Sequence, residues 1–184
     1  VQRAKNLKFG DPSKKDTNVG PLINRDQVDR ILKDIEASVS QGAKIRIGGD
    51  ADGNVLEPTV ITDVNNEMPL AKNEIFGPVA ILIPFEKDED VVQMANAYPY
   101  GLSGAVHSKN IEHATDIAHD IHTGMIHIND QSVNDEPHMP FGGEKDSGLG
   151  RFNGEWVLEE FTTLKWLSVQ RNPRNYGPFI SQLK

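Results

Sequence analysis

A carboxylate and an aromatic ring stand two residues apart in the segment 74–79, Glu-Ile-Phe-Gly-Pro-Val, just before an apolar run. A carboxylate at such a loop-to-strand junction can accept hydrogen bonds from both hydroxyls of a ribose, and these junctions line ligand crevices in α/β folds. An aromatic ring at Phe76 can give the sugar or an adjacent ring an apolar wall. The residues alone also allow a plainer interpretation, in which Glu74 lies on the surface and Phe76 in the core.

A glycine-rich stretch, residues 140–151, reads Pro-Phe-Gly-Gly-Glu-Lys-Asp-Ser-Gly-Leu-Gly-Arg. Glycines permit positive φ angles and close backbone approach, so the stretch is typical of a tightly bent loop. A phosphate cradle is the alternative interpretation. It lacks the spacing of a P-loop, because Asp146 separates Lys145 from Ser147.

The six histidines, at positions 107, 113, 119, 122, 127 and 138, show no metal-binding signature. His119 and His122 could share one helix face, but a zinc site needs a third ligand that converges on them. We expect these histidines to lie on the surface or to have satisfied hydrogen bonds, and we expect no metal.

The bulk composition describes a soluble globular chain of 184 residues with a net charge of −8. That charge disfavours nucleic acid and anionic membrane as partners. No apolar run approaches the roughly 20 residues of a membrane helix, and the chain opens without a signal peptide. With no cysteine, disulfides and thiolate metal sites are excluded. We therefore expect a cytoplasmic protein.

Helical and strand patterns alternate along the chain, which predicts an α/β fold with a largely parallel sheet and flanking helices. Helices are expected over 1–9, from a cap at Asn24 to Gly42, over 89–97, from a cap at Asn110 to 121, and over 155–161. Strands are expected over 43–47, 55–61, 78–85, 102–107, 125–128 and 164–169, and the tail after Arg171 is expected to be irregular.

Three of these elements carry further expectations. Asn24 with Gln27 three residues later is a capping-box pattern. Pro58 favours an edge position for the strand over 55–61, because proline cannot donate to a ladder. The apolar run over 78–85 is typical of a strand buried on both faces.

Three segments in this order, 74–79, Gly-Met-Ile-His-Ile-Asn at 124–129 and the loop 140–148, resemble the C-terminal part of an NAD(P)-dependent aldehyde dehydrogenase. The resemblance implies that Glu74 and Phe76 bind the nicotinamide-side ribose of NAD or NADP. It implies that Gln27 and Arg30 approach the same ribose.

The resemblance also assigns roles around the glycine-rich loop. Phe141 matches a position whose ring contacts the substrate, and Asn129 matches an architectural asparagine that bonds nearby loops, while Gly142 and Gly143 are structural. Many members that act on aliphatic aldehydes carry an aromatic residue where Asp135 stands. The wording of 134–143 looks like that of the benzaldehyde, vanillin and salicylaldehyde dehydrogenases, which implies an aromatic aldehyde as the small-molecule substrate.

The family's mechanism needs a cysteine thiolate that attacks the aldehyde carbon to give a thiohemiacetal. This chain has none. We therefore expect a fragment, residues 1–158 being part of a catalytic domain, with no catalytic residue of its own and with the nucleophile upstream. The uncapped helix at Val1 agrees with that. The alternative is a stand-alone, non-catalytic assembly or ligand-binding module.

The C-terminal residues 159–184 resemble the family's oligomerisation strand and tail. Leu164, Trp166 and Ser168 alternate as in an edge strand that seeks a partner, which implies a homodimer or homotetramer for the full-length protein. An ordinary edge strand within one subunit is the alternative.

Overall fold

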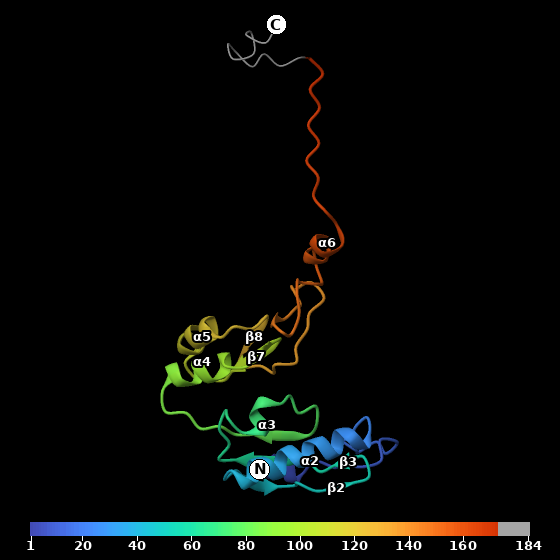
Figure 1. The fold of residues 1–184 in the computed structure, drawn as a ribbon, viewed down its shortest axis with the longest axis vertical. Coiled ribbons are helices and arrows are strands. Elements are labelled where there is room, and N and C mark those ends of the chain that lie inside the picture. Colours follow the sequence, from blue (N-terminus) through green and yellow to red (C-terminus); the bar gives the residue numbers. More distant parts are fainter. Residues whose placement is uncertain (173–184) are drawn as a thin grey trace.

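A computed structural model of the chain describes residues 1–172. Its elements form two groups around separate small sheets, and the following segment extends away from both (Figure 1). The first group holds α1 (Gln2–Lys5), α2 (Arg25–Ser40), β1 (Lys44–Ile47), β2 (Ala51–Asp52), β3 (Val55–Leu56), β4 (Thr59–Thr62), α3 (Pro69–Lys72) and β5 (Val79–Ile81). The second holds α4 (Asp88–Asn96), β6 (Tyr100–Gly101), β7 (Ser103–Val106), α5 (Ile111–Asp120), β8 (Met125–Ile128) and β9 (Glu144–Lys145). Helix α6 (Trp156–Phe161) lies on the extending segment.

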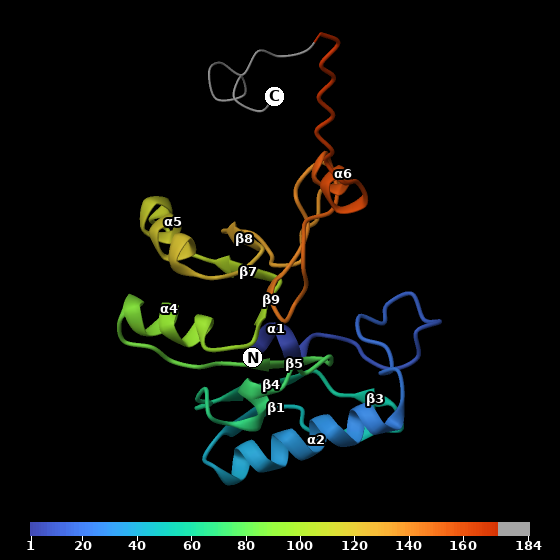
Figure 2. The same ribbon diagram turned by 45° about the horizontal axis from the view of Figure 1, so that its top comes forward.

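The predicted α/β class is confirmed, with parallel pairing between β4 and β5 and between β7 and β8. The remaining pairs, β1 with β4, β2 with β3 and β6 with β9, are antiparallel. Helix α2 runs along one face of the first sheet (Figure 2). Its Ile31 and Ile35 are buried with Leu56, Ile61 and Leu70 in one apolar core.

Helix α2 begins at the predicted cap. The side chain of Asn24 accepts a hydrogen bond of 2.9 Å from the backbone N–H of Gln27, one of the donors that a helix start leaves unpaired. The reciprocal half of the capping box, in which the Gln27 side-chain oxygen would accept from the N–H of Asn24, is not formed. That oxygen accepts instead from Nε of Arg30 at 3.2 Å, and the amide nitrogen donates to the carbonyl of Ile75 at 2.9 Å. One helix end is thereby linked to the segment that carries Glu74 and Phe76.

The strand predicted over 55–61 is wrong in its extent and its position. The predicted strand is interrupted at Pro58 and forms two strands. Before it, β3 pairs with β2 in a hairpin; after it, β4 lies between β1 and β5 at the centre of the three-stranded sheet. Proline is tolerated beside this central strand because it precedes the first strand residue and need not donate to the ladder. Thr59, the first residue of β4, donates its N–H to the carbonyl of Pro78.

The predicted strand over 78–85 is shorter and less buried than expected. Only Val79–Ile81 pairs as β5, and Ala80, Leu82 and Phe85 are exposed. In the described part of the chain, β4 is the single neighbour of β5. Val79, Ile81 and Ile83 pack against the core, so the exposed Ala80 and Leu82 alternate with them onto the opposite face of the sheet.

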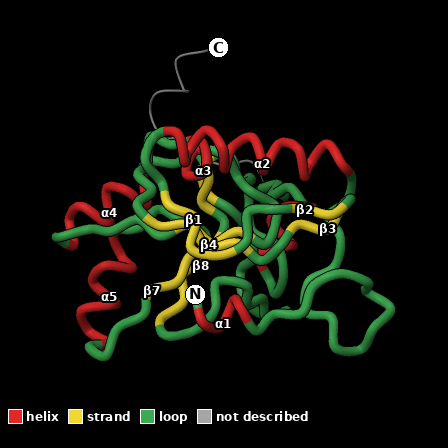
Figure 3. Tube along the Cα trace, turned by 90° about the horizontal axis from the view of Figure 1, so that it is seen from below, coloured by secondary structure: helices red, strands yellow, loops and turns green. Residues whose placement is uncertain are grey.

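Two helices also differ from expectation. The first, α1, spans four residues rather than nine. The short helix α3, with Pro69 at its first position, was not predicted; it lies beside α2 on the same side of the sheet (Figure 3). It positions the loop that follows, because Asn73 ends the helix and Glu74 comes next. No helix within residues 1–172 is long and apolar enough to cross a bilayer.

The second group follows the sequence prediction closely. Helix α5 begins at Asn110, whose side chain accepts from the backbone N–H of His113, and it packs against β7 and β8. The pair between β6 and β9 was not predicted, since two-residue strands 44 positions apart leave no local pattern. This pair holds residues 144 and 145, inside the glycine-rich loop, beside β6.

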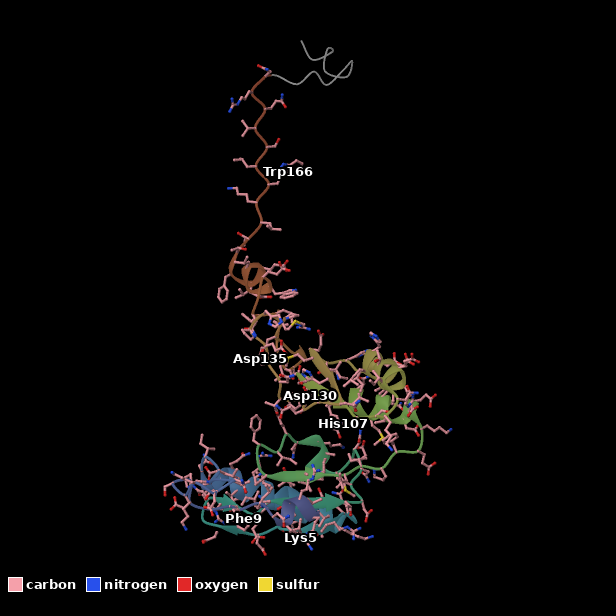
Figure 4. All side chains as sticks on the ribbon, turned by 180° about the vertical axis from the view of Figure 1, so that it is seen from behind. Lys5, Phe9, His107, Asp130, Asp135 and Trp166 are labelled. Carbon is pink, nitrogen blue, oxygen red and sulfur yellow. The ribbon has the colours of Figure 1, made fainter. Side chains whose placement is uncertain are left out.

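The segment after α6 extends away from both groups and carries Trp166 (Figure 4). Within residues 1–172 the predicted strand over 164–169 has no ladder partner. Leu164 is fully exposed and Trp166 is 92% exposed. Most of the tail predicted to be irregular, residues 173–184, lies outside the described residues.

Candidate cofactor and substrate site

The loop between α3 and β5 presents Glu74 and Phe76 to solvent. Within residues 1–172 the Glu74 carboxylate has no hydrogen-bond or ion-pair partner, and the Phe76 ring is 73% exposed. Phe76 has a φ of +47°, a left-handed conformation that non-glycine residues adopt infrequently. Gly77 follows in close contact with α2: a Cβ there would lie 2.7 Å from Cδ1 of Ile31. The loop thus offers an unpaired acceptor beside an uncovered ring.

The carbonyl groups of this loop face α2 and are hydrogen-bonded by it. The Gln27 amide donates to the carbonyls of Ile75 at 2.9 Å and Phe76 at 3.4 Å. The Arg30 guanidinium donates to those of Glu74 at 3.0 Å and Ile75 at 2.9 Å. The four cofactor residues expected from the sequence therefore meet at one loop, with two presented outward and two holding its backbone.

The glycine-rich loop is held by cations that end on backbone carbonyls. Arg151 donates to the carbonyls of Gly143 and Gly150 at 3.1 and 2.9 Å and pairs with the carboxylate of Glu144. Lys145 donates to the carbonyls of Asn96 and Tyr98 at 3.1 and 3.0 Å. The basic side chains in this stretch therefore donate to protein groups, and this disfavours the phosphate-cradle interpretation.

Phe141 lies at the entrance to that loop and is half-buried. Its backbone exchanges two hydrogen bonds with Phe152, at 2.9 and 2.7 Å. The Phe152 ring in turn meets that of Phe161 edge to face, with centroids 6.2 Å apart. Gly142 and Gly143 are buried. Phe141 is therefore connected to α6 as well as to the loop, through its backbone bonds to Phe152 and the ring contact between Phe152 and Phe161.

Asp135 lies at the rim of a cavity of about 370 Å³ beside β8. The cavity is lined by Gly124, Met125, Ile126, His127, Asn134, Asp135, Glu136, Met139 and Pro140. The Asp135 carboxylate accepts a hydrogen bond of 3.0 Å from the amide of Asn153. Figure 4 shows Asp135 between β8 and the extending segment.

His127 in this cavity departs from the expectation for the histidines. Its Nε2 is buried and has no hydrogen-bond partner among the described residues. The signal was a titratable side chain inside an otherwise apolar four-residue strand, Met-Ile-His-Ile. An unpaired ring nitrogen in a cavity wall can donate to or accept from a polar ligand group.

Asn129 ends β8 and has a φ of +59°. Its side chain accepts from the backbone N–H of Ser108 and donates to the carbonyl of the same residue, each at 2.9 Å. The two bonds join the ends of the parallel strands β7 and β8. Within residues 1–172 no three His, Asp or Glu side chains converge so as to hold a metal ion.

The predicted site residues form two clusters. Gln27, Arg30, Glu74 and Phe76 belong to the loop before β5, while Asn129, Asp135, Phe141, Gly142 and Gly143 follow β8. In the described part of the chain no hydrogen bond or ion pair joins one cluster to the other.

Residues 1–167 match the aldehyde dehydrogenase family model, and the chain belongs to that family. It is 50% identical to benzaldehyde dehydrogenase YfmT of Bacillus subtilis over 95% of its own length and 36% of that protein. The chain thus spans little more than a third of the relative.

Solved structures agree. A salicylaldehyde dehydrogenase from Pseudomonas putida G7, complexed with salicylaldehyde, superposes with a TM-score of 0.92 at 34% identity, over 96% of this chain and 37% of that one. Betaine aldehyde dehydrogenase from Staphylococcus aureus, in complex with NAD+, gives 0.88 at 34% identity, over 97% and 37%. The predicted family resemblance is confirmed.

Proposed function

We propose that this chain is the C-terminal region of an aldehyde dehydrogenase that oxidises an aromatic aldehyde to the carboxylic acid with NAD+ or NADP+. The observation that carries the proposal is the loop before β5, where Glu74 and Phe76 stand unpaired on a backbone held by Gln27 and Arg30. The names of the relatives support both the cofactor and the substrate class.

The loop residues fit one end of a dinucleotide. The Glu74 carboxylate accepts hydrogen bonds from ribose hydroxyls, and the exposed Phe76 ring covers the sugar or the nicotinamide. When bound, the cofactor supplies the acceptor for the hydride that leaves the aldehyde carbon. The chain's own contribution is to bind and orient that acceptor.

The nucleophile lies outside these 184 residues in this proposal. The chain has no cysteine and covers 36% of the length of its benzaldehyde dehydrogenase relative. A cysteine thiolate in the remaining part would attack the aldehyde to form the thiohemiacetal. Residues 1–158 then complete the catalytic domain. The cytoplasmic location stays a prediction from the sequence.

Aromatic substrates are proposed from the segment after β8. Asp135, His127 and Met139 line the cavity, and Phe141 follows the lining residue Pro140 in the sequence. We expect the complete protein to show a kcat/KM for benzaldehyde at least about tenfold above that for acetaldehyde, because a flat ring fills apolar space that a methyl group leaves empty. Steady-state NADH formation with both aldehydes tests this. A higher efficiency with acetaldehyde would refute the aromatic assignment.

A second copy of the protein is the proposed partner of residues 159–184. The extended segment exposes Leu164, Trp166 and Val169, and residues 164–169 have no ladder partner within residues 1–172. Strand pairing between subunits would cover these side chains and supply a ladder partner. Light scattering on the complete protein should give the mass of a dimer or tetramer, and a single-subunit mass would contradict the assignment.

A further inference from the structure

The guanidinium of Arg30 joins α2 to the loop that carries Glu74 and Phe76. It donates four hydrogen bonds: to Oε1 of Gln27 at 3.2 Å, to Oδ2 of Asp34 at 3.2 Å, and to the carbonyls of Glu74 and Ile75. Since a guanidinium has five N–H donors, nearly all of its capacity is used within the protein.

Asp34 lies one helical turn after Arg30 in α2 and accepts one of these hydrogen bonds. Its side chain is 15% exposed, against 37% for that of Arg30, so the carboxylate is the more buried member of the pair. Both of its oxygens also accept from the amide of Asn73, each at 3.2 Å. Asn73 immediately precedes Glu74. Asp34 is therefore connected to the loop in two ways. It accepts directly from Asn73, the residue before Glu74, and it pairs with Arg30, which donates to the carbonyls of Glu74 and Ile75.

The conformation of the loop depends on these hydrogen bonds, because the side chains that it points to solvent make none among the described residues that could stabilise it. The Glu74 carboxylate has no partner within residues 1–172, and Phe76 lies exposed in a left-handed backbone conformation. A residue in that region stays there only when its surroundings determine it. The surroundings here are the donors of Gln27 and Arg30, which end on three consecutive carbonyls.

We propose that Asp34 is a positioning residue for cofactor binding. With Gln27, Arg30 and Asn73 it forms a clamp of four residues, 27, 30, 34 and 73, that presents Glu74 and Phe76 to the ribose. Gln27 and Arg30 act on the cofactor through the loop carbonyls in this proposal, in addition to any direct contact with the ribose. The inference rests on the proposed function, since it takes the cofactor as the ligand of this loop.

The test is the Asp34→Asn substitution in the complete protein, with NADH as the probe. The side chain keeps its size but loses the charge that orients Arg30. The Kd for NADH, from fluorescence titration, should rise about fivefold, because a loosened loop occupies its binding conformation for a smaller fraction of the time. The KM for NAD+ should rise by a similar factor and the KM for benzaldehyde should not change. Amide hydrogen exchange over 74–77 should become faster.

Helix α2 provides a matched control. Arg25 and Asp29 form the same i,i+4 pair at 2.8 Å, but Arg25 donates to the carbonyl of Gly53 and not to the loop. Asp29→Asn should leave the Kd for NADH unchanged. Asp34→Glu retains the carboxylate, so this variant should keep most of the wild-type affinity for NADH. Asn73→Ala removes only the first link and should raise the Kd about twofold, which keeps the test available if Asp34→Asn fails to fold.

The outcomes separate the clamp from the function. If Glu74→Ala weakens NADH binding while Asp34→Asn and Asn73→Ala do not, the clamp is overturned and the cofactor site stands. Faster exchange over 74–77 with an unchanged Kd would reduce Asp34 to a structural role and also overturn the proposal. If wild type binds NADH and neither Glu74→Ala nor Asp34→Asn alters its affinity, the loop is not the cofactor site and both inferences fail.

Discussion

Replacing Glu74 by alanine in the complete protein should raise the Kd for NADH about 100-fold and lower kcat/KM for benzaldehyde by a similar factor. The carboxylate is exposed and has no partner within residues 1–172, so its loss would remove both of the charge-assisted bonds that we propose it accepts from the ribose. Glu74→Gln keeps one acceptor oxygen without the charge, and we expect about a tenfold loss.

The control for this experiment is Glu36→Ala. Glu36 is also exposed and has no hydrogen bond or ion pair within residues 1–172, but it lies on the solvent face of α2. Its replacement removes the same charge and should leave the Kd for NADH within about twofold of the wild-type value. Equal effects of the two substitutions would mean that Glu74 acts only through net charge, and the ribose contact would be wrong.

Replacing Gly124 by alanine should displace the glycine-rich loop. A Cβ at this position would overlap the carbonyl oxygen of Gly142, and both groups belong to the backbone, so no rotamer change can relieve the clash. We expect a loss of about 1–3 kcal/mol in the free energy of unfolding. The kcat/KM for benzaldehyde should fall at least about tenfold, because Phe141 directly precedes the displaced residue.

Gly104 offers the matched substitution in the neighbouring strand. It lies in β7 opposite Ile126, and the atom nearest to a Cβ there would be Cδ1 of Ile126 at an ordinary 3.8 Å. Gly104→Ala should therefore change stability little or raise it slightly. Chemical denaturation measures both variants, and a wild-type midpoint for Gly124→Ala would show that the loop does not pack against β8 as described.

Local signals in the sequence were sufficient for the helices that carry caps. Asn24 and Asn110 each accept from the N–H three residues later, as their positions before apolar stripes predict. The turn between β2 and β3 was also within reach, because Asp52-Gly53 is a turn signal, and Gly53 has a φ of +55° in the structure. The prediction was wrong over 55–61 because it continued one strand through Pro58, where β3 has already ended and β4 has not begun.

Long-range contacts were not readable in the same way. Glu74 and Phe76 were found through the family resemblance, since a carboxylate and a ring before a strand have many ordinary explanations. The contact behind the proposed role of Asp34 was not predicted, because it forms only when α3 brings Asn73 next to α2, 39 residues away in the chain. His127 was missed because its burial depends on a cavity formed by a segment further along the chain.

Aldehyde-dependent NADH formation, measured on the complete protein and on this 184-residue chain alone, tests whether the chain is one part of an aldehyde dehydrogenase. We predict benzaldehyde oxidation by the complete protein and none by the chain, because the 184 residues contain no cysteine thiol and no other side chain in them can replace a thiolate. Turnover by the chain alone would contradict it. So would an inactive complete protein that binds NADH, which would favour a non-catalytic binding module.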